Sequence, residues 1–285
     1  MNYDNLLGLY YGNKEVVKGL IDGNIFYEKW NYIRNGLTNL YDVDAIAQEP
    51  DSSGRLYCYN KFEDDFPPDY LPTPSLNNNV FIETEDGIGK SLHYSSGEIA
   101  FGISIKADSQ INLSHIQTIE IVVKPTNSGK SMQSIIEGPN NISINWLNAA
   151  NGSYQPGTFI ITNRVKNSIY DITYRPVYYV PLNSFYNRRH VITVNTAREL
   201  YIDGLAIEAI PGGALSSNLG EVNNLLNKVF VLGTSYAFKN GSYSLNSSYS
   251  SGNIYQIRCY GRSLTASEII HNHRIDLRRY GISNQ

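Results

Sequence analysis

Apolar and polar residues alternate with a period of two along most of the second half of the chain. The clearest examples are residues 99–105 and 118–124, where Ile, Val or Phe occupies every second position. Such alternation predicts strands with one buried face. Further strands are predicted at 143–147, 158–162, 169–174, 190–194, 199–202, 228–232 and 253–260, separated by turn clusters such as 148–152 and 203–204. The pattern predicts an all-β, antiparallel two-sheet sandwich.

One helix is predicted, at the C-terminal end of this sandwich. Thr265 followed three positions later by Glu268 is the pattern of a capping box. The helix is expected from residue 266 to about 279, because Gly281 provides a left-handed stop.

Residues 1–35 are predicted to form a unit separate from the sandwich of residues 36–285. Gly-Asn pairs at 12–13 and 23–24 favour tight turns between strands at 6–11, 15–21 and 25–30. This β-meander has too few strands to bury a core alone. It is therefore expected to dock on a partner or to form a homo-oligomer, most simply a trimer; an extra edge of the main sheet is the alternative. The expected contacts are Leu9, Val16, Leu20, Ile21, Phe26 and Tyr27.

Residues 51–79 are rich in Asp, Pro, Asn and Ser and include Pro67-Pro68. Proline is excluded from helix interiors and central strands. An extended surface loop over the sandwich is predicted there.

The overall composition excludes several classes of protein. Hydrophobic residues make up 41% and charged residues 17%, with a formal net charge of −3 and no basic cluster. Disorder and nucleic-acid binding are not expected. No apolar run suits a signal peptide or a membrane span. Cys58 and Cys259 are too far apart in sequence for a metal motif, and both are expected to be reduced core residues.

Residues 260–269, Tyr-Gly-Arg-Ser-Leu-Thr-Ala-Ser-Glu-Ile, resemble the closing strand and helix of concanavalin A-like, laminin-G-like domains. Tyr-Ile-Asp-Gly at 201–204, Val-Leu-Gly at 231–233 and the segment 36–42 are similar to other strands of that family. The resemblance implies a jelly-roll sandwich over residues 36–285.

The N-terminal segment 11–29 resembles the attachment hairpins of phage virion proteins. Together with the laminin-G-like domain, it implies a tailed-phage structural protein, a head-fibre or tail component. The expected location is the virion, assembled in the host cytoplasm, with other capsid or tail proteins as partners.

Carboxylates give little support to catalysis, although this fold also hosts glycoside hydrolases. A retaining hydrolase needs two carboxylates about 5–5.5 Å apart facing one groove. Glu83-Thr84-Glu85-Asp86 and Glu63-Asp64-Asp65 come nearest, and both are interpreted as solvated loop acids. The protein is predicted not to be an enzyme, with a divergent glycosidase as the least favoured alternative.

No cofactor is expected. A structural calcium ion is an alternative, with Asp42 and Asp44, or Asp64 and Asp65, as oxygen ligands. Asp203 is interpreted as an exposed turn residue, and His190 as isolated.

Tyrosine is unusually frequent, with 23 Tyr against 9 Phe and 2 Trp. Its amphipathic ring suits partner surfaces and sugar faces; packing in the core is the alternative. A recognition loop is predicted at 237–252, and the candidate ligand residues are Tyr178, Tyr179, Tyr236, Tyr243 and Tyr249. A carbohydrate-binding module for host surface glycans is therefore the second interpretation, after the virion protein.

Overall fold

The structure of the chain is a computed structural model. It describes residues 9–11, 14–16, 18–21, 24–28, 32–43, 56–58, 69–71, 80–95, 101–104, 116–137, 143–166, 171–175, 177–195, 199–210, 215–218, 229–232, 236–239, 242–245 and 250–282.

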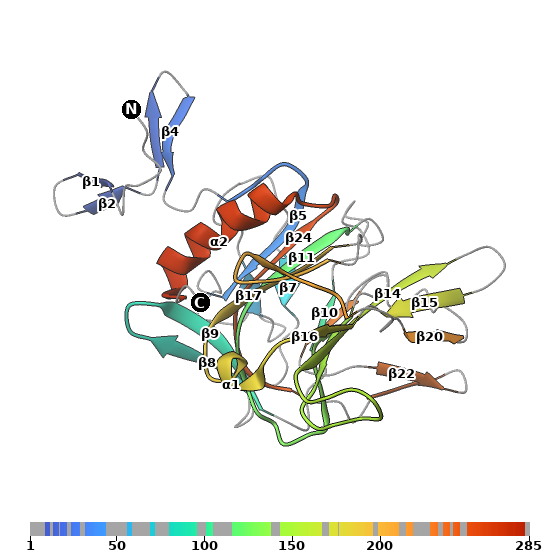
Figure 1. Cartoon of the computed structure of the whole chain (residues 1–285). Coiled ribbons are helices and arrows are strands. Elements are labelled where there is room, and N and C mark those ends of the chain that lie inside the picture. Colours follow the sequence, from blue (N-terminus) through green and yellow to red (C-terminus); the bar gives the residue numbers. More distant parts are fainter. Residues whose placement is uncertain are drawn as a thin grey trace.

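Two eight-stranded antiparallel sheets dominate the fold (Figure 1). The first sheet has the order β19 (Leu205–Ile207), β18 (Leu200–Ile202), β17 (His190–Asn195), β11 (Thr118–Thr126), β24 (Ser251–Tyr260), β9 (Gly89–Tyr94) and β8 (Val80–Glu85), and β5 (Leu37–Asp42) also pairs with β24. The second has the order β10 (Phe101–Ser104), β21 (Val229–Leu232), β12 (Met132–Glu137), β13 (Ser143–Leu147), β14 (Thr158–Lys166), β15 (Asp171–Arg175) and β20 (Leu215–Asn218), and β16 (Val177–Tyr179) also pairs with β14.

The main core lies between these two sheets. Ile121 on β11 and Ile257 on β24 contribute from the first sheet, and Trp146 on β13 and Phe159 on β14 from the second. The Trp146 and Phe159 rings stack with centroids 5.8 Å apart, and Phe185, from the one-turn helix α1 (Leu182–Phe185), meets both edge-on. This shared core confirms the predicted all-β sandwich.

The outer face of the first sheet is covered by helix α2 (Ala266–Tyr280), drawn in red in Figure 1. The predicted capping box is present, and Gly281 ends the helix at φ 58°. Ile269 packs against Tyr260 near the start of the helix, and Tyr280 packs against Tyr255 at its end. The apolar stripe of the helix therefore docks along β24.

A β-bulge in β24 changes which side chains face this helix. Val122 pairs with Gln256 and Val123 with Ile254, so Tyr255 is the extra residue. Ile254 and Ile257 belong to the core between the sheets, whereas Tyr255 packs with the end of α2. The bulge thus places Tyr255 on the outer face.

Several sequence predictions need correction. The single strand predicted at 15–21 is two strands, and the N-terminal segment forms two separate hairpins, β1 (Leu9–Tyr11) with β2 (Lys14–Val16) and β3 (Lys18–Ile21) with β4 (Asn24–Glu28). Neither hairpin pairs with a sandwich strand among the described residues, against the edge-strand alternative. The division of the chain at residue 35 stays a prediction.

Two stretches predicted as loops contain paired strands. Within 51–79, β6 (Leu56–Cys58) pairs with β7 (Asp69–Leu71). At the start of 237–252, β22 (Tyr236–Lys239) pairs with β23 (Ser242–Leu245).

None of the helices in the described chain has the length and apolarity that a membrane crossing requires.

Candidate functional site

The two predicted ligand tyrosines on β16 point to opposite faces of the sheet. Tyr178 is 2% exposed and belongs to the main core, whereas Tyr179 is 42% exposed. Alternation along the strand explains the difference. The core position of Tyr178 contradicts its prediction as a ligand residue, and Tyr179 stays a candidate.

The other predicted ligand tyrosines, Tyr236, Tyr243 and Tyr249, lie in the 237–252 region or next to it. Tyr236 lies opposite Leu245 and Tyr243 lies opposite Phe238 in the β22–β23 hairpin. Tyr249 lies outside the described residues. Recognition by these tyrosines stays a prediction; for Tyr236 and Tyr243 it now falls on a hairpin rather than a loop.

The predicted docking residues all lie on the four N-terminal strands. Pairing places Leu9 of β1 opposite Val16 of β2. Leu20 and Ile21 lie on β3, and Phe26 and Tyr27 on β4. Their contacts with a partner stay predictions.

The calcium prediction fails at Asp42. This carboxylate is fully buried, and the Arg279 Nη2 atom donates to both of its oxygens, at 2.8 and 2.7 Å. An ion pair with arginine leaves no site for a cation there. Asp44, Asp64 and Asp65 lie outside the described residues, and the described part of the chain holds no cluster of three metal-ligating side chains.

A second buried network joins α2 to the sheet. The Arg258 guanidinium donates to Glu120 Oε2 at 2.8 Å and to both carboxylate oxygens of Asp276, at 2.8 and 2.5 Å. Burial raises the pKa of Glu120, and Arg258 only partly offsets this. Burial alone would lower the pKa of Arg258, but Asp276 and Glu120 raise it well above its usual value. All three side chains are at most 1% exposed, so the network holds the helix and cannot meet a ligand.

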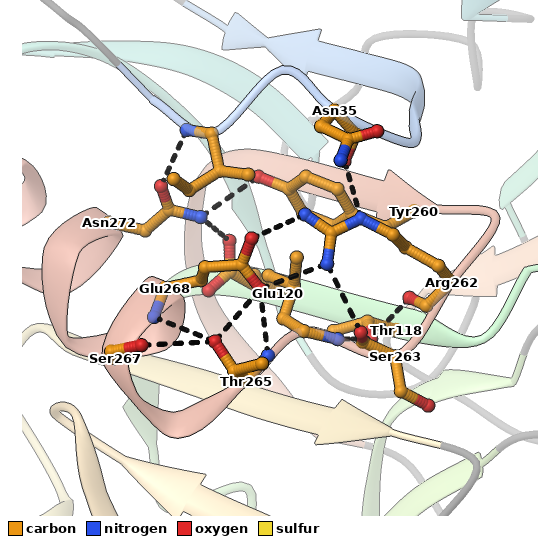
Figure 2. Close-up of polar contacts among 12 residues, drawn as sticks. Asn35, Thr118, Glu120, Tyr260, Arg262, Ser263, Thr265, Ser267, Glu268 and Asn272 are labelled. Atoms are coloured by element: carbon orange, nitrogen blue, oxygen red, sulfur yellow. Dashed lines mark hydrogen bonds and ion pairs between the residues drawn. The ribbon is translucent and has the colours of Figure 1, made fainter.

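The start of α2 carries a further polar cluster, which Figure 2 shows beside Glu120 and Asn272. Arg262 donates to both oxygens of Glu268, at 2.9 and 2.5 Å, and to the Asn35 carbonyl at 2.8 Å. Glu268 Oε2 also accepts from the Thr265 backbone at 2.9 Å. The hydrogen bond from Arg262 is the main cause that lowers the pKa of Glu268 to about 2. These groups satisfy one another, so the cluster is a structural cap.

His190 and Asp203 form a pair that the sequence analysis treats as two unrelated residues. Asp203 adopts a left-handed turn conformation with φ 54°, as expected, but is only 7% exposed. Its carboxylate contacts His190 Nδ1 at 2.7 Å and accepts from the Val191 backbone at 2.8 Å. Since His190 is 2% exposed and stacks on Phe185, the pair stabilises the β18–β19 turn.

A different set of residues lies on the outer face of the first sheet, beyond the C-terminal end of α2. The teal hairpin of β8 and β9 lies beside that end in Figure 1, and Ile88 in its turn packs against Tyr280 and Ile282. Ile82 and Leu92 on this hairpin, and Val123 and Ile254 on the neighbouring β11 and β24, face the main core, so the alternate positions on these four strands face outward. We call the outward-facing set the β8–β9 patch; its members are Phe81, Glu83, Glu85, His93, Lys124 and Asn253.

Strand register aligns four members of the patch in a row. Phe81 on β8 pairs with His93 on β9, His93 pairs with Asn253 on β24, and Asn253 pairs with Lys124 on β11. With strands about 4.8 Å apart, the row is about 14 Å long. The Phe81 and His93 rings stack with centroids 4.5 Å apart, and Phe81 is still 38% exposed. A partly exposed aromatic ring therefore lies beside hydrogen-bonding groups.

Glu85 is the electrostatic centre of the patch. It accepts from the Tyr255 hydroxyl at 2.5 Å and forms an ion pair with Arg189, and Lys124 Nζ lies 3.6 Å from its Oε1. Burial would raise the pKa of Glu85, but the hydrogen bonds from Tyr255 and Arg189 outweigh it and lower the pKa. Glu85 is therefore a fixed anion at neutral pH.

The patch was not predicted from sequence, where Glu83 and Glu85 are interpreted as solvated loop acids. Both lie in strand β8, and the turn that contains Gly87 is the turn of the β8–β9 hairpin. Val80, Ile82 and Thr84 alternate with Phe81, Glu83 and Glu85, and this alternation would have predicted the strand.

Neither a scan against protein-family models nor a search of curated proteins finds a match. A comparison with solved structures finds similarity to the CBM40 domain of the Ruminococcus gnavus IT-sialidase bound to alpha2,3 sialyllactose. It is 15% identical, with a TM-score of 0.40, over 63% of this chain and 94% of that one. The Trypanosoma rangeli sialidase in complex with sialic acid is 11% identical, with a TM-score of 0.47, over 90% of this chain but only 35% of that one.

The binding domain of botulinum neurotoxin DC, in complex with rat synaptotagmin II, is 16% identical, with a TM-score of 0.43, over 74% of this chain and 49% of that one. These three similarities concern carbohydrate-binding, sialidase and toxin domains, and none of the three is a virion protein. At such identities and TM-scores, the sandwich assignment rests on the strand topology of the chain itself.

Proposed function

We propose that the protein is a carbohydrate-binding module that recognises a glycan at the β8–β9 patch. The observation that carries the proposal is the row from Phe81 to Lys124, in which an exposed aromatic ring adjoins imidazole and ammonium groups, with the buried Asn253 amide between them. Sugar rings have apolar C–H faces that stack on aromatic rings and hydroxyls that need hydrogen-bonding partners. The row is about 14 Å long, enough for two or three sugar rings.

Charge at the patch supports binding rather than catalysis. A glycosidase needs one carboxyl group that stays protonated, with a raised pKa, to act as a general acid. Hydrogen bonds from Tyr255 and Arg189 hold the pKa of Glu85 below its usual value, and Arg189 forms an ion pair with the Glu85 carboxylate. Glu85 therefore cannot serve as that acid beside Glu83.

A glycan array followed by titration calorimetry tests this function. Phe81→Ala is expected to weaken binding about fivefold, since an aromatic contact contributes about 1 kcal/mol. Ile270→Ala is the matched control, because Ile270 is also 38% exposed but lies on α2. Equal affinities for the wild type and Phe81→Ala, or no glycan bound at all, would refute the proposal. Release of free sugar during the assay would support the glycosidase alternative.

A second role, attachment through the N-terminal hairpins, is favoured by one observation. Strands β1 to β4 pair only with one another in the described chain. We propose that they dock the protein on a partner or on further copies of itself, in keeping with a location in the virion. Light scattering is expected to give a mass above the 32.0 kDa of one chain, and Phe26→Asp to reduce it. A single-chain mass for the wild type, and absence from purified virions by mass spectrometry, would overturn this role.

A further inference from the structure

The Glu83 carboxylate differs from the other charges of the β8–β9 patch. Its Oε2 accepts from Asn253 Nδ2 at 2.6 Å, and the same nitrogen donates to Ser91 Oγ at 3.0 Å. Asn253 is 5% exposed and Ser91 is fully buried, so this support is fixed within the sheet. Glu83 itself is exposed, and among the described residues no donor meets its Oε1. One carboxylate oxygen is therefore held in place while the other remains open.

Two nearby positive charges interact with Glu85 and not with Glu83. Arg189 forms an ion pair with Glu85 and also donates to the Tyr255 hydroxyl, and Lys124 Nζ lies 3.6 Å from Glu85. Glu83 has the neutral Asn253 amide as its partner instead of a cation. Asp86, exposed in the turn of the same hairpin, adds another negative charge. The side of the patch next to Phe81 is thus acidic.

Distances along β8 connect this carboxylate to the aromatic ring. Phe81 and Glu83 are two positions apart on one face, which separates their Cα atoms by about 6.7 Å. A single sugar ring can therefore stack on Phe81 while its hydroxyls reach Glu83. An ionised carboxylate only accepts hydrogen bonds, so it suits hydroxyl donors and repels a second anion.

We infer that the ligand of the patch is a neutral, hydroxyl-rich sugar whose adjacent hydroxyls donate to Glu83, and that Glu83 discriminates against acidic sugars. This inference rests on the proposed function, and it adds the class of ligand and the residue that determines specificity.

The test compares neutral oligosaccharides with the same oligosaccharides capped by a carboxylate- or sulfate-bearing sugar, by calorimetry on the full chain. The wild type is expected to bind the neutral members at least tenfold more tightly. Glu83→Gln keeps the shape of the side chain but removes the charge. It is expected to weaken binding of neutral sugars about tenfold and to reduce the discrimination. Glu208→Gln, an exposed glutamate after β19, is the matched control and should behave as the wild type.

The outcomes separate this inference from the function on which it rests. If acidic sugars bind as tightly as neutral ones or more tightly, and Phe81→Ala still weakens them, the patch binds glycans but the inference is wrong. If Glu83→Gln binds and discriminates as the wild type does, the role of Glu83 is wrong. If no sugar of either kind binds, both proposals fail. A circular dichroism spectrum like that of the wild type shows that each variant is folded.

Discussion

Arg279 near the end of α2 donates from a single nitrogen, Nη2, to both carboxylate oxygens of Asp42, 237 residues earlier on β5. Arg279 is 6% exposed and Asp42 fully buried, so the pair lies out of reach of solvent ions. Burial would lower the pKa of Arg279, but the neighbouring Tyr280, Asp42 and Tyr32 raise it well above the usual value. The ion pair therefore fixes the last turn of the helix to the strand that pairs with one end of β24.

Loss of the Asp42 charge is expected to destabilise the protein strongly. Asp42→Asn leaves the buried Arg279 without its carboxylate, and removing one partner of a buried pair costs about 3–5 kcal/mol. Chemical denaturation of the wild type and the variant measures the change in the free energy of unfolding. Asp86→Asn, in the exposed turn after β8, is the control and is expected to change it by less than about 0.5 kcal/mol. Similar midpoints for the two variants would contradict the buried ion pair as a source of stability.

The fold could be predicted from sequence wherever one face of an element is uniformly apolar. β13 and α2 agree with their predicted bounds closely, because strand alternation and the capping box are local patterns. The predictions fail where polar residues line a strand. β8 carries Glu83 and Glu85 because its outer face is open to solvent, and this makes it resemble a loop in sequence.

The candidate site is less predictable than the fold, because register and bulges assemble it. Phe81, His93 and Asn253 are 12 and 160 residues apart in sequence, and only the pairing of β8, β9 and β24 places them side by side. Likewise, the bulge that turns Tyr255 toward Glu85 has no clear sequence pattern. Tyrosine counts indicated surface recognition, yet Tyr178, Tyr255, Tyr260 and Tyr280 are all buried.

The capping box at the start of α2 leads to a prediction of moderate size. Thr265→Ala removes the side-chain oxygen that accepts from the Glu268 backbone at 3.4 Å, and it is expected to reduce the free energy of unfolding by about 1 kcal/mol. Ser267→Ala is the control, because the Ser267 hydroxyl contacts only that of Thr265, at 3.1 Å. If Thr265→Ala reduced the free energy of unfolding no more than Ser267→Ala does, the Thr265 cap would not stabilise the helix.

Stability at acid pH should depend on Glu268. Its pKa is lowered from 4.5 to about 2 in the folded protein, chiefly by the hydrogen bond from Arg262. A carboxyl group with a lowered folded-state pKa stabilises the protein above its unfolded pKa and loses that contribution as the pH falls. Glu268→Gln is therefore expected to flatten the decline of the unfolding free energy between pH 4.5 and 2.

Adding Arg262→Met to Glu268→Gln tests the assigned cause of that decline. Once the carboxylate is gone, Arg262 has no charge partner at residue 268, so the double variant should show the same pH slope as the single one. The measurement is urea denaturation at a series of pH values. A slope between pH 4.5 and 2 that is unchanged from the wild type in Glu268→Gln would show that other carboxyl groups control acid stability.

The Tyr186 hydroxyl, just after α1, is the centre of a hydrogen-bond network at the edge of the main core. Tyr186 Oη accepts from Trp146 Nε1 at 2.8 Å and from Gln133 Nε2 at 2.9 Å, and it donates to Asn148 Oδ1 at 3.1 Å. Tyr186→Phe leaves the donors of two fully buried side chains without this acceptor, which costs about 1–3 kcal/mol for each unsatisfied buried group. We expect a lower denaturation midpoint together with a changed near-UV dichroism band of Trp146. Tyr154→Phe, at a half-buried position in the turn after β13, is the control and should leave both the midpoint and the dichroism band unchanged. If Tyr186→Phe had wild-type stability, water would replace the lost hydroxyl without a cost in free energy.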